Sequence, residues 1–452
     1  MKKLILVLAL CLVLITGAAC MPSSNPKPTD PTEVNLDLDR NMTAELSILV
    51  PGGNANETDM ILKANEGFNL LYPNVNISVN YLSVNTYEND IRQLVAAETL
   101  DDIIWTNSPD FYYLVANNVA LNLNAYIEAS EEANVFDFEE DFLTEYFDMG
   151  SHNGKLYAVP RSADSVVTFF NRTILTAAGV NLELVENGWS WDTFMTICQQ
   201  VRDYFDANNM SDRYVLDANL TTWLSTSYPI LRSFGADVVD DEGNVTIDSP
   251  QTREALELVR EMVEKRFIVE SVMSSGSSFE SGTSAFLFQS ASVSLYANRK
   301  DLKGNIDIVS FPLIQETNNP KIGSGIAGYS INAASDKRDL AWAYINYLMS
   351  YDGQQQLALG GLNLPSVRND LQDYSNPEIN WSKDYSDFNL EAYLYGAEYK
   401  TGEDFLGKFD PSYKTMLQQA IKDLFNNASN TGKTIDECMT TVVRDINDAL
   451  GI

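Results

Sequence analysis

The chain has 452 residues, 45% of them hydrophobic, so it can fold as a globular protein but is large for one core and suits two lobes. With 63 acidic residues against 30 basic ones, its formal net charge of -33 argues against nucleic acid and anionic membrane surfaces as partners. The acidic balance leaves open either a solvated acidic surface or a preference for a cationic ligand.

The first residues have the pattern of an export signal. Lys2 and Lys3 precede an apolar run from Leu4 to Ile15, and small residues then lead to Cys20. A charged start, an apolar stretch too short for a comfortable membrane span and a small-residue cleavage site together predict a signal peptide over residues 1–19.

A cysteine directly after small residues resembles a bacterial lipobox, although Gly17 stands where leucine is usual. This resemblance implies that the thiol of Cys20 carries a lipid such as palmitate and becomes the new N-terminus. The alternative is an ordinary secretory signal cleaved near Ala19. Met21 to Thr32 is rich in Pro, Ser, Asn and Thr, a composition that cannot build a core. We therefore expect residues 20–43 to be a lipidated cysteine followed by a flexible tether.

Strands and helices alternate in the next part of the chain. The predicted elements are a strand at 46–50, a helix at 57–71, a strand at 75–82, a helix at 87–97 and a strand at 102–105. This alternation predicts a parallel sheet with helices on its faces. Because ligands bind outside the carboxyl ends of the strands in such sheets, the polar loops after Val50 and Trp105 are candidate binding loops.

The stretch from Asn153 to Val180 has the pattern of a crossing between two lobes. Asn153-Gly154 predicts a turn, and a short strand follows that ends at Pro160. The polar loop Arg161–Asp164 separates it from a second apolar strand at 166–170, after which Asn171 can cap a helix. An extended crossing with a polar gap is what a hinge requires.

Further elements follow the crossing and predict a second lobe. They are a helix from Trp191 to about Phe205 capped by Ser190 or Asp192, a helix from Pro250 to about Arg266, strands at 285–288 and 306–311, a glycine-rich return near 323–331 and a helix at 340–349. The glycines of the return segment allow close backbone approach or hinge rotation. We expect the chain from about Asp370 to be helical and rich in aromatic residues.

Cysteine and histidine usage limits the possible chemistry. Outside the N-terminal region the chain has only Cys198 and Cys438, far apart and not in a metal-ligand spacing. A disulfide between them is possible but does not follow from the sequence. A Ser-His-Asp arrangement would need the single histidine, His152, which we expect to be a solvent-exposed turn residue. We predict no metal and no cofactor.

In order, these segments resemble those of bacterial extracellular solute-binding proteins, the sugar-binding, maltose-binding-like branch that serves ABC importers. The matching runs are the crossing, with Phe170-Asn171-Arg172 for the usual Tyr-Asn-Lys, then Trp191-Asp192-Thr193-Phe194, and the run from Gly353 to Pro365. The resemblance covers about Glu45 to Arg368. It implies a two-lobed α/β fold of the type II periplasmic-binding-protein kind, each lobe a mainly parallel sheet flanked by helices, joined by a multi-strand hinge. The implied lobes are 44–165 with 327–362, and 166–326 with 363–452.

The resemblance also implies where a ligand would bind. Ser292 stands where the family often has a tryptophan that stacks on sugar, so Tyr296 is the expected substitute. Arg161 could pair with the hinge carboxylate of Asp164 or bind the ligand itself. The candidate ligand-binding residues are Asn54, Trp105, Thr106, Asn107, Asp110, Arg161, Asp164, Trp223, Ser225, Tyr228, Ser292, Tyr296 and Trp381.

We therefore predict a monomeric lipoprotein on the outer face of the cell membrane that captures a sugar or oligosaccharide by hinge closure. It would deliver this ligand to the transmembrane subunits of an ABC permease, without enzymatic activity and without binding nucleic acid. One alternative keeps the fold but binds a cationic ligand such as a polyamine or peptide. A second alternative is an exported glycoside hydrolase, which needs two carboxylates flanking the scissile bond.

Overall fold

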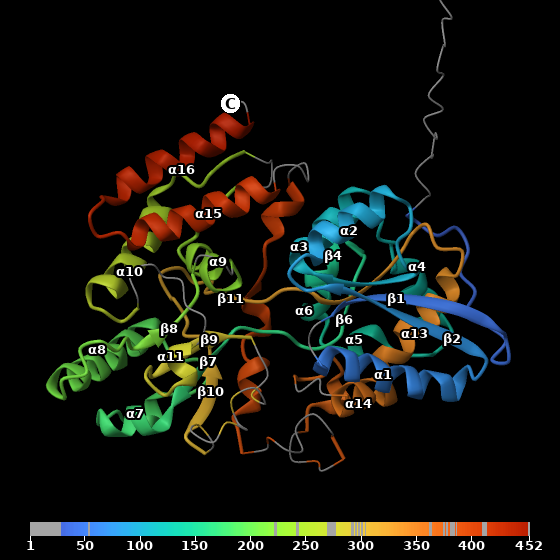
Figure 1. Cartoon of the computed structure of the whole chain (residues 1–452), viewed down its shortest axis with the longest axis horizontal. Helices are drawn as coiled ribbons and strands as arrows, with labels where there is room; N and C mark the ends of the chain where they lie inside the picture. The colour runs from blue at the N-terminus through green and yellow to red at the C-terminus, as the bar shows by residue number, and fades with distance from the viewer. Residues whose placement is uncertain are drawn as a thin grey trace, which may run out of the picture.

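Two sheets lie side by side, each flanked by helices, in this computed structural model of the chain (Figure 1). The structure describes residues 29–450 apart from short gaps. These gaps are 53–54, 221–223, 241–243, 269–276, 291–292, 294–295, 297–298, 300–301, 303, 361–363, 374–375, 377, 380–384, 386 and 409–413. We call the units built around the two sheets the first lobe and the second lobe.

The first lobe contains a five-stranded sheet in the order β2-β1-β3-β12-β6. Its strands are β1 Ala44–Gly52, β2 Val75–Ser83, β3 Ile103–Asn107, β6 Val159–Pro160 and β12 Ala327–Ile331. Strand β1 is parallel to β2 and β3, whereas β12 is antiparallel to β3 and β6. Its helices are α1 Ala55–Leu71, α2 Tyr87–Ala96, α3 Ser108–Ala116, α4 Asn124–Glu132, α5 Phe138–Asp141, α6 Thr144–Phe147, α13 Arg338–Met349 and α14 Tyr351–Leu359.

The second lobe contains a four-stranded sheet in the order β10-β7-β9-β8. Its strands are β7 Val167–Asn171, β8 Leu216–Asp217, β9 Phe286–Gln289 and β10 Ile306–Ser310, and only the β8–β9 pair is parallel. Its helices are α7 Arg172–Ala177, α8 Trp191–Ala207, α9 Leu224–Ser233, α10 Pro250–Glu264, α11 Ser277–Glu280, α15 Lys414–Ser429 and α16 Ile435–Leu450. In each sheet one crossing strand, β12 in the first and β7 in the second, runs against the direction of the other strands. Both sheets are therefore mixed, with most of their described strands running in one direction as the sequence predicted.

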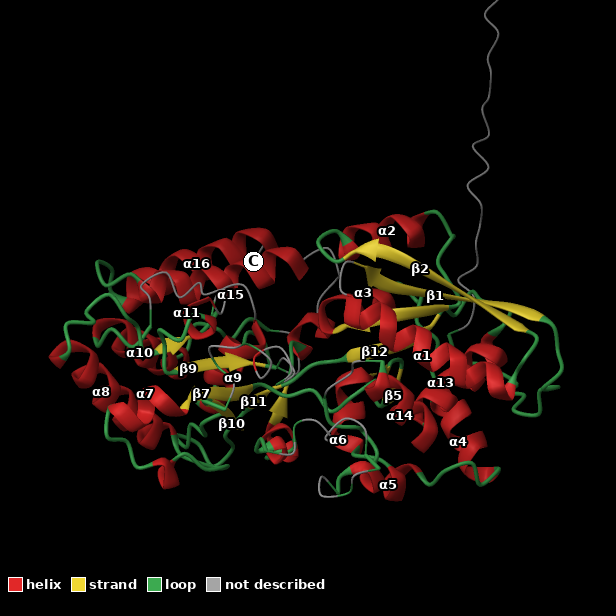
Figure 2. Ribbon diagram, turned by 60° about the horizontal axis from the view of Figure 1, so that its bottom comes forward, coloured by secondary structure: helices red, strands yellow, loops and turns green. Residues whose placement is uncertain are grey.

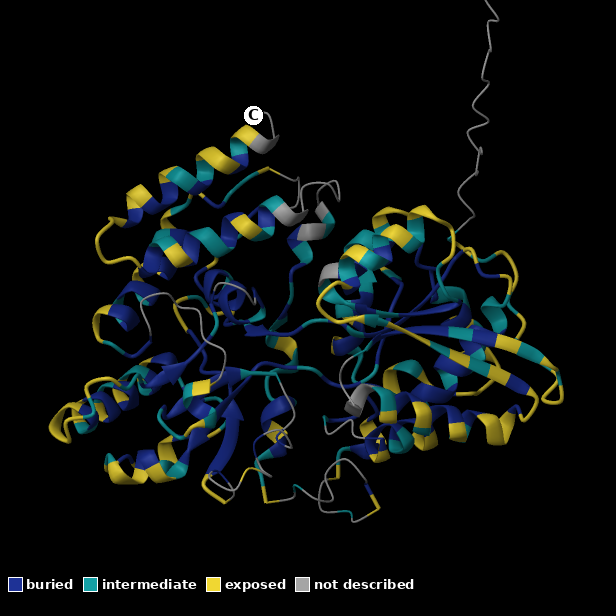
Figure 3. Ribbon diagram, viewed as in Figure 1, coloured by how far each residue is buried: buried dark blue, intermediate teal, exposed yellow. Residues whose placement is uncertain are grey.

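Alternation along the strands places apolar side chains on both faces of each sheet. In β1, Leu46, Ile48 and Val50 pack with α1, α13 and α14, whereas Leu49 packs on the opposite face with α2 and α3. Figure 2 shows these two helical layers on either side of the first sheet. Figure 3 shows the strands of the second lobe as largely buried, whereas β2, at the edge of the first sheet, is mostly intermediate or exposed. The outer faces of the helices are exposed.

Most predicted elements are found within a few residues of their expected ends, but two segments differ. The described part of the chain between Asn369 and Lys408 contains no α-helix. Its regular elements are the short 3-10 helices η3 Asn369–Leu371, η4 Leu390–Tyr393, η5 Ala397–Tyr399 and η6 Asp404–Lys408 and the strand β13 Lys400–Thr401. Glycines at 396, 402 and 407 disfavour a continuous helix there, and the long helices come only with α15 and α16.

The second difference concerns the expected tether. Residues 29–43 lie against the first lobe, where Val34, Leu36 and Leu38 pack on its core. The carboxylate of Asp30 accepts hydrogen bonds from Asn122 Nδ2 at 2.9 Å and from Lys155 Nζ at 3.0 Å, and these bonds lower the pKa of Asp30. The alternating apolar residues dock this segment, although the polar composition just before them suggested a free chain. Residues 1–28, with Cys20, lie outside the described residues.

In the described part of the chain, the crossing segments at 161–166, 323–327 and 364–366 are joined by backbone hydrogen bonds. Ala163 N donates to Pro365 O at 2.8 Å, Val166 N donates to Gly323 O at 2.8 Å, and Arg161 N donates to Ala327 O at 3.1 Å. The crossings therefore form one connected hinge region, in agreement with the multi-strand hinge expected from the sequence.

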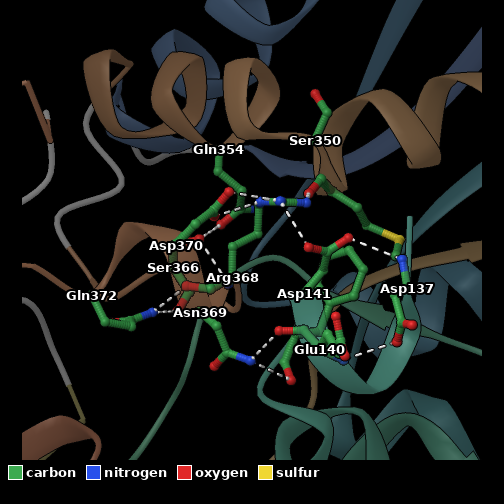
Figure 4. Close-up of polar contacts among 12 residues, drawn as sticks. Asp137, Glu140, Asp141, Ser350, Gln354, Ser366, Arg368, Asn369, Asp370 and Gln372 are labelled. Atoms are coloured by element: carbon green, nitrogen blue, oxygen red, sulfur yellow. Dashed lines mark hydrogen bonds and ion pairs between the residues drawn. The ribbon is translucent and has the colours of Figure 1, made fainter. Parts of the chain in front are cut away.

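A polar network around Arg368 anchors the third crossing (Figure 4). Two nitrogens of Arg368 each donate to Asp370 at 2.8 Å, its Nη2 lies 3.7 Å from Asp141, and its guanidinium lies 5.2 Å from the ring centre of Phe142. Nearby, Ser366 Oγ donates to Gln354 Oε1 at 2.7 Å. The network thus fastens the crossing to α5, α14 and the segment after α5.

We expect Arg368→Met to lower the free energy of unfolding by about 1–3 kcal/mol, because a largely buried charged donor is removed while its acceptors stay. Chemical denaturation monitored by circular dichroism measures this change. Arg444→Met is the matched control, since its pair with Asp445 is exposed and should contribute at most about 0.5 kcal/mol. Equal effects of the two substitutions would contradict the anchoring role.

Candidate ligand-binding site between the lobes

A cavity of about 270 Å³ lies between the two lobes, beside the first and second crossings. Its lining combines residues from both lobes, from the crossings and from the C-terminal part of the chain. These residues are Asn107, Ser108, Asp164, Val166, Ser225, Ser290, Gly323, Ser324, Gly325, Ile326, Ala327 and Glu403. The same space is therefore bordered by elements that would move relative to one another if the hinge bends.

On the first-lobe side the cavity lies where β3 ends and α3 begins. The side chain of Asn107 accepts a hydrogen bond from Asp110 N at 2.9 Å and caps α3, while Ser108 Oγ accepts one from Ile326 N at 2.9 Å. The carboxyl end of a sheet strand is where ligands bind in open α/β sheets, as the sequence predicted for the loop after Trp105.

Asp164 supplies the central charged group of the cavity. Its backbone carbonyl accepts a hydrogen bond from Ser324 Oγ at 2.7 Å, and its carboxylate interacts with the Ser290 side chain. Its Oδ1 atom is buried and has no hydrogen-bond partner in the described part of the chain. Burial raises the pKa of Asp164 to about 6, although Arg161 and Lys400 favour the charged form. A buried acceptor of this kind calls for a donor from a ligand or a water molecule.

Glu403 is a second carboxylate on the cavity wall, and it is 6% exposed. Gln418 Nε2 donates a hydrogen bond to its Oε2 at 2.8 Å, which ties it to α15. Sequence reasoning did not identify Glu403, because it follows the region of family resemblance and is one of 63 acidic residues without a distinguishing motif.

The described lining is polar and built from small side chains. It contributes four serine residues, the Asn107 amide and two carboxylates, and it includes neither an aromatic nor a basic side chain. Hydroxyls, amides and carboxylates can exchange hydrogen bonds with a ligand rich in hydroxyl groups. Water exclusion would strengthen each such bond.

Three of the predicted site residues, Asn107, Asp164 and Ser225, line this cavity together. Trp105 and Arg161 form a pair outside the described lining, with the Arg161 guanidinium 5.8 Å from the centre of the Trp105 ring. Asn54, Trp223, Ser292 and Trp381 lie outside the described residues.

Four other predicted site residues are placed in the interiors of the lobes. Thr106 Oγ1 bonds to Ser330 Oγ at 2.9 Å, and Asp110 is buried in the first turn of α3. Tyr228 donates to Asp237, and Tyr296 lies edge-on to Phe169 with ring centres 4.9 Å apart. None of the four lines the cavity, because packing within a lobe occupies each of these side chains.

His152 is half-buried rather than fully exposed, and its ring faces Tyr112 with ring centres 6.2 Å apart. Burial lowers the pKa of its imidazole. In the part of the chain that the structure describes, no cluster of side chains could hold a metal ion, and Cys198 and Cys438 are both buried free thiols. None of the described helices is long and apolar enough to cross a membrane.

The sequence matches the family of bacterial extracellular solute-binding proteins over residues 54–355. The chain belongs to this family. Two relatives of this solute-binding protein are named arabinooligosaccharide-binding proteins. One, from Halalkalibacterium halodurans, is 22% identical over 260 residues, which is 55% of each chain. The other, from Bacillus subtilis, is 23% identical over 336 residues, covering 71% of this chain and 72% of the relative.

The alignment thus spans only about half of the first relative. Among solved structures, an ABC substrate-binding protein from Listeria monocytogenes in complex with cycloalternan superposes on this solute-binding protein with a TM-score of 0.70 at 17% identity. The match covers 91% of this chain and 100% of that one. This likeness confirms the predicted two-lobed α/β fold of the type II periplasmic-binding kind.

Proposed function

We propose that this solute-binding protein captures a sugar or oligosaccharide between its lobes and delivers it to the transmembrane subunits of an ABC importer. The observation that carries this proposal is the buried Oδ1 of Asp164, which has no hydrogen-bond partner among the described residues, in a cavity lined by serine hydroxyls and the Asn107 amide. The names of the two relatives and the sugar bound to the structural neighbour support a saccharide as the ligand.

Binding would work by hinge closure. A ligand that contacts Asn107 in the first lobe and Ser225 in the second makes its full set of contacts only when the lobes are closed, so it shifts the population toward the closed form. The mechanism involves no bond-making or bond-breaking.

The hydrolase alternative also has a specific observation behind it, because Asp164 and Glu403 place two carboxylates in one cavity. The test below therefore includes a search for sugar cleavage.

We further propose that the protein is exported, that its Cys20 carries a lipid, and that it works as a monomer on the outer face of the cell membrane. The family name fits export, and the N-terminal signal pattern followed by Cys20 supports the anchor. Palmitate labelling of the wild-type protein and of Cys20→Ser in a bacterial host tests the anchor, since only the wild type should be labelled.

The proposed function is tested by a thermal-shift screen of residues 21–452 against arabino- and maltooligosaccharides, with polyamines and basic peptides as controls. A ligand at a hundred times its Kd stabilises the folded state by about 2.7 kcal/mol and raises Tm. We expect a shift with one class of saccharide and no cleavage products on long incubation. A shift with cations alone would favour the cationic ligand, and released products would favour the hydrolase.

A further inference from the structure

The C-terminal strap, which we define as residues 395–405, runs between the two lobes and follows the part of the chain matched by the family. Its strand β13 pairs in parallel with β11, Ile322–Gly323, and Thr401 O accepts a hydrogen bond from Ser324 N at 2.9 Å. Arg232 of α9 donates to Thr401 Oγ1 and to Asp404, each at 3.2 Å. The strap is thus fixed beside the second crossing and joined to the second lobe.

Residues of the strap line two cavities. Glu403 lines the ligand cavity, whereas Lys400 lines a second cavity of about 330 Å³. The first lobe contributes Tyr112 and His152 to this second cavity, and the second lobe contributes Arg232. Lys400 therefore lines a cavity other than the ligand cavity.

The ammonium group of Lys400 reaches the hinge loop that carries Asp164. Lys400 Nζ donates to the hydroxyl of Ser165, the residue directly after Asp164, and to Tyr395 O at 3.4 Å. It also lies 5.9 Å from the ring centre of Tyr146. The ammonium group of Lys400 is thereby held next to the loop that carries the Asp164 carboxylate. The Oδ1 atom of this carboxylate is buried and has no hydrogen-bond partner among the described residues.

We propose that Lys400 is a positioning residue for ligand binding, which keeps the Asp164 carboxylate ionised so that it accepts hydrogen bonds from ligand hydroxyls. The effect of Lys400 on ligand affinity rests on the proposed function, whereas its effect on the charge of Asp164 does not. Asp164 and Lys400 each favour the charged form of the other. Burial lowers the pKa of Lys400 to about 7 while Asp164 opposes this shift, and Lys400 in turn favours the ionised form of Asp164.

The proposal predicts a specific dependence of ligand affinity on pH. Burial raises the pKa of Asp164 to about 6, so its carboxylate gains a proton and loses acceptor capacity as the pH falls through about 6. At that pH Lys400 is charged. Removing its charge should raise the pKa of Asp164 further and move the loss of affinity to higher pH. Among the described residues, other titratable or charged groups near this pair are Arg161, Tyr146, Tyr393, Glu398, Glu403, Tyr112, Asp148, His152, Arg232 and Asp404.

The test measures the Kd of the saccharide found in the screen for wild type, Lys400→Met and Lys400→Arg between pH 5 and pH 9. For an upward shift of about one pH unit, we expect Lys400→Met to bind about fivefold more weakly at pH 6 and as tightly as wild type near pH 9. Lys400→Arg should retain the wild-type profile. A loss of equal size at every pH, or no change in the profile, would overturn the proposal.

Two controls separate other causes. Lys63→Met removes one positive charge from an exposed ion pair on α1 and should leave the profile unchanged. His152→Gln removes an imidazole whose pKa is lowered by burial, and the difference between wild type and Lys400→Met should persist in this background. If His152→Gln abolished that difference, the histidine rather than Asp164 would carry the pH dependence.

A ligand-free measurement distinguishes failure of this proposal from failure of the proposed function. A double-mutant cycle of Asp164→Asn and Lys400→Met, read as shifts in Tm, should show coupling at pH 6.5 and none at pH 5, where Asp164 is protonated. Coupling without binding of any saccharide would support the role of Lys400 toward Asp164 and would refute the proposal that the protein binds a saccharide. Absence of coupling at both pH values would refute the role of Lys400, whether or not a sugar binds.

Discussion

Asp164→Asn is expected to weaken saccharide binding by about tenfold to a hundredfold at pH 8, as measured by isothermal titration calorimetry. The substitution keeps the shape of the side chain but removes a charged acceptor, and hydrogen bonds to charged groups contribute about 1.5–3 kcal/mol. The Oδ1 atom of Asp164 is buried without a partner in the described chain, so the ligand is the group that would supply its donor.

The same substitution should not lower the stability of the ligand-free protein. Burial raises the pKa of Asp164 to about 6, above its value in the unfolded chain. The folded state therefore binds this proton more tightly, and stability falls as the pH rises from about 4 through about 6. At pH 8, Asp164→Asn should thus stabilise the ligand-free protein by about 1–3 kcal/mol.

Asp203→Asn on α8 is the matched control, since Asp203 accepts a hydrogen bond from Gln199 in an exposed pair. This substitution should change neither the affinity nor the stability. Weaker saccharide binding together with equal or higher stability in Asp164→Asn would show that Asp164 serves ligand binding rather than folding. Loss of stability together with full binding would instead assign Asp164 to the architecture of the hinge.

Gly323→Val is expected to destabilise the protein by about 1–3 kcal/mol and to reduce saccharide affinity at least tenfold. A Cβ atom at Gly323 would overlap the carbonyl oxygen of Ser225 and lie 2.9 Å from Cγ2 of Val166. Ser225 lines the cavity on its second-lobe side, and Val166 belongs to the first crossing. A side chain at Gly323 therefore forces the wall and the two crossings apart.

Chemical denaturation and calorimetry of Gly323→Ala and Gly323→Val measure these effects, and the valine variant should show the larger change. Gly432→Ala provides the control, because its Cβ would meet only the side-chain oxygen of Asn430, in the loop between α15 and α16. Wild-type affinity in Gly323→Val would show that close packing of the second crossing against Ser225 is not needed for binding.

Local sequence signals predicted those parts of the site that depend on nearby residues. The strand pattern that ends at Trp105 predicted the binding loop that contains Asn107. The resemblance to solute-binding proteins implied that Asp164, in the polar gap before Val166, supplies a ligand-binding carboxylate. The same resemblance implied Tyr228 as part of the second lobe's binding segment and Tyr296 as a substitute for the tryptophan missing at Ser292. Both are buried within the second lobe, because an aromatic side chain near a binding loop is equally suited to a core.

The contribution of the C-terminal part could not be predicted in the same way. Glu403 and Lys400 reach the hinge through the pairing of β13 with β11, about 80 residues apart in sequence. No local periodicity encodes such a contact. The docking of residues 29–43 was missed for a related reason, since a single buried face of Val34, Leu36 and Leu38 is a weak signal beside a long polar stretch.

Hydrogen–deuterium exchange with and without the saccharide found in the screen tests the central claim most directly. The account predicts that one ligand protects both walls of the cavity at once, in peptides that contain residues 107–108, 164–166, 225, 323–327 and 403. Protection should be weak in Asp164→Asn at the same ligand concentration. Protection confined to one lobe, or located away from these segments, would contradict binding between the lobes.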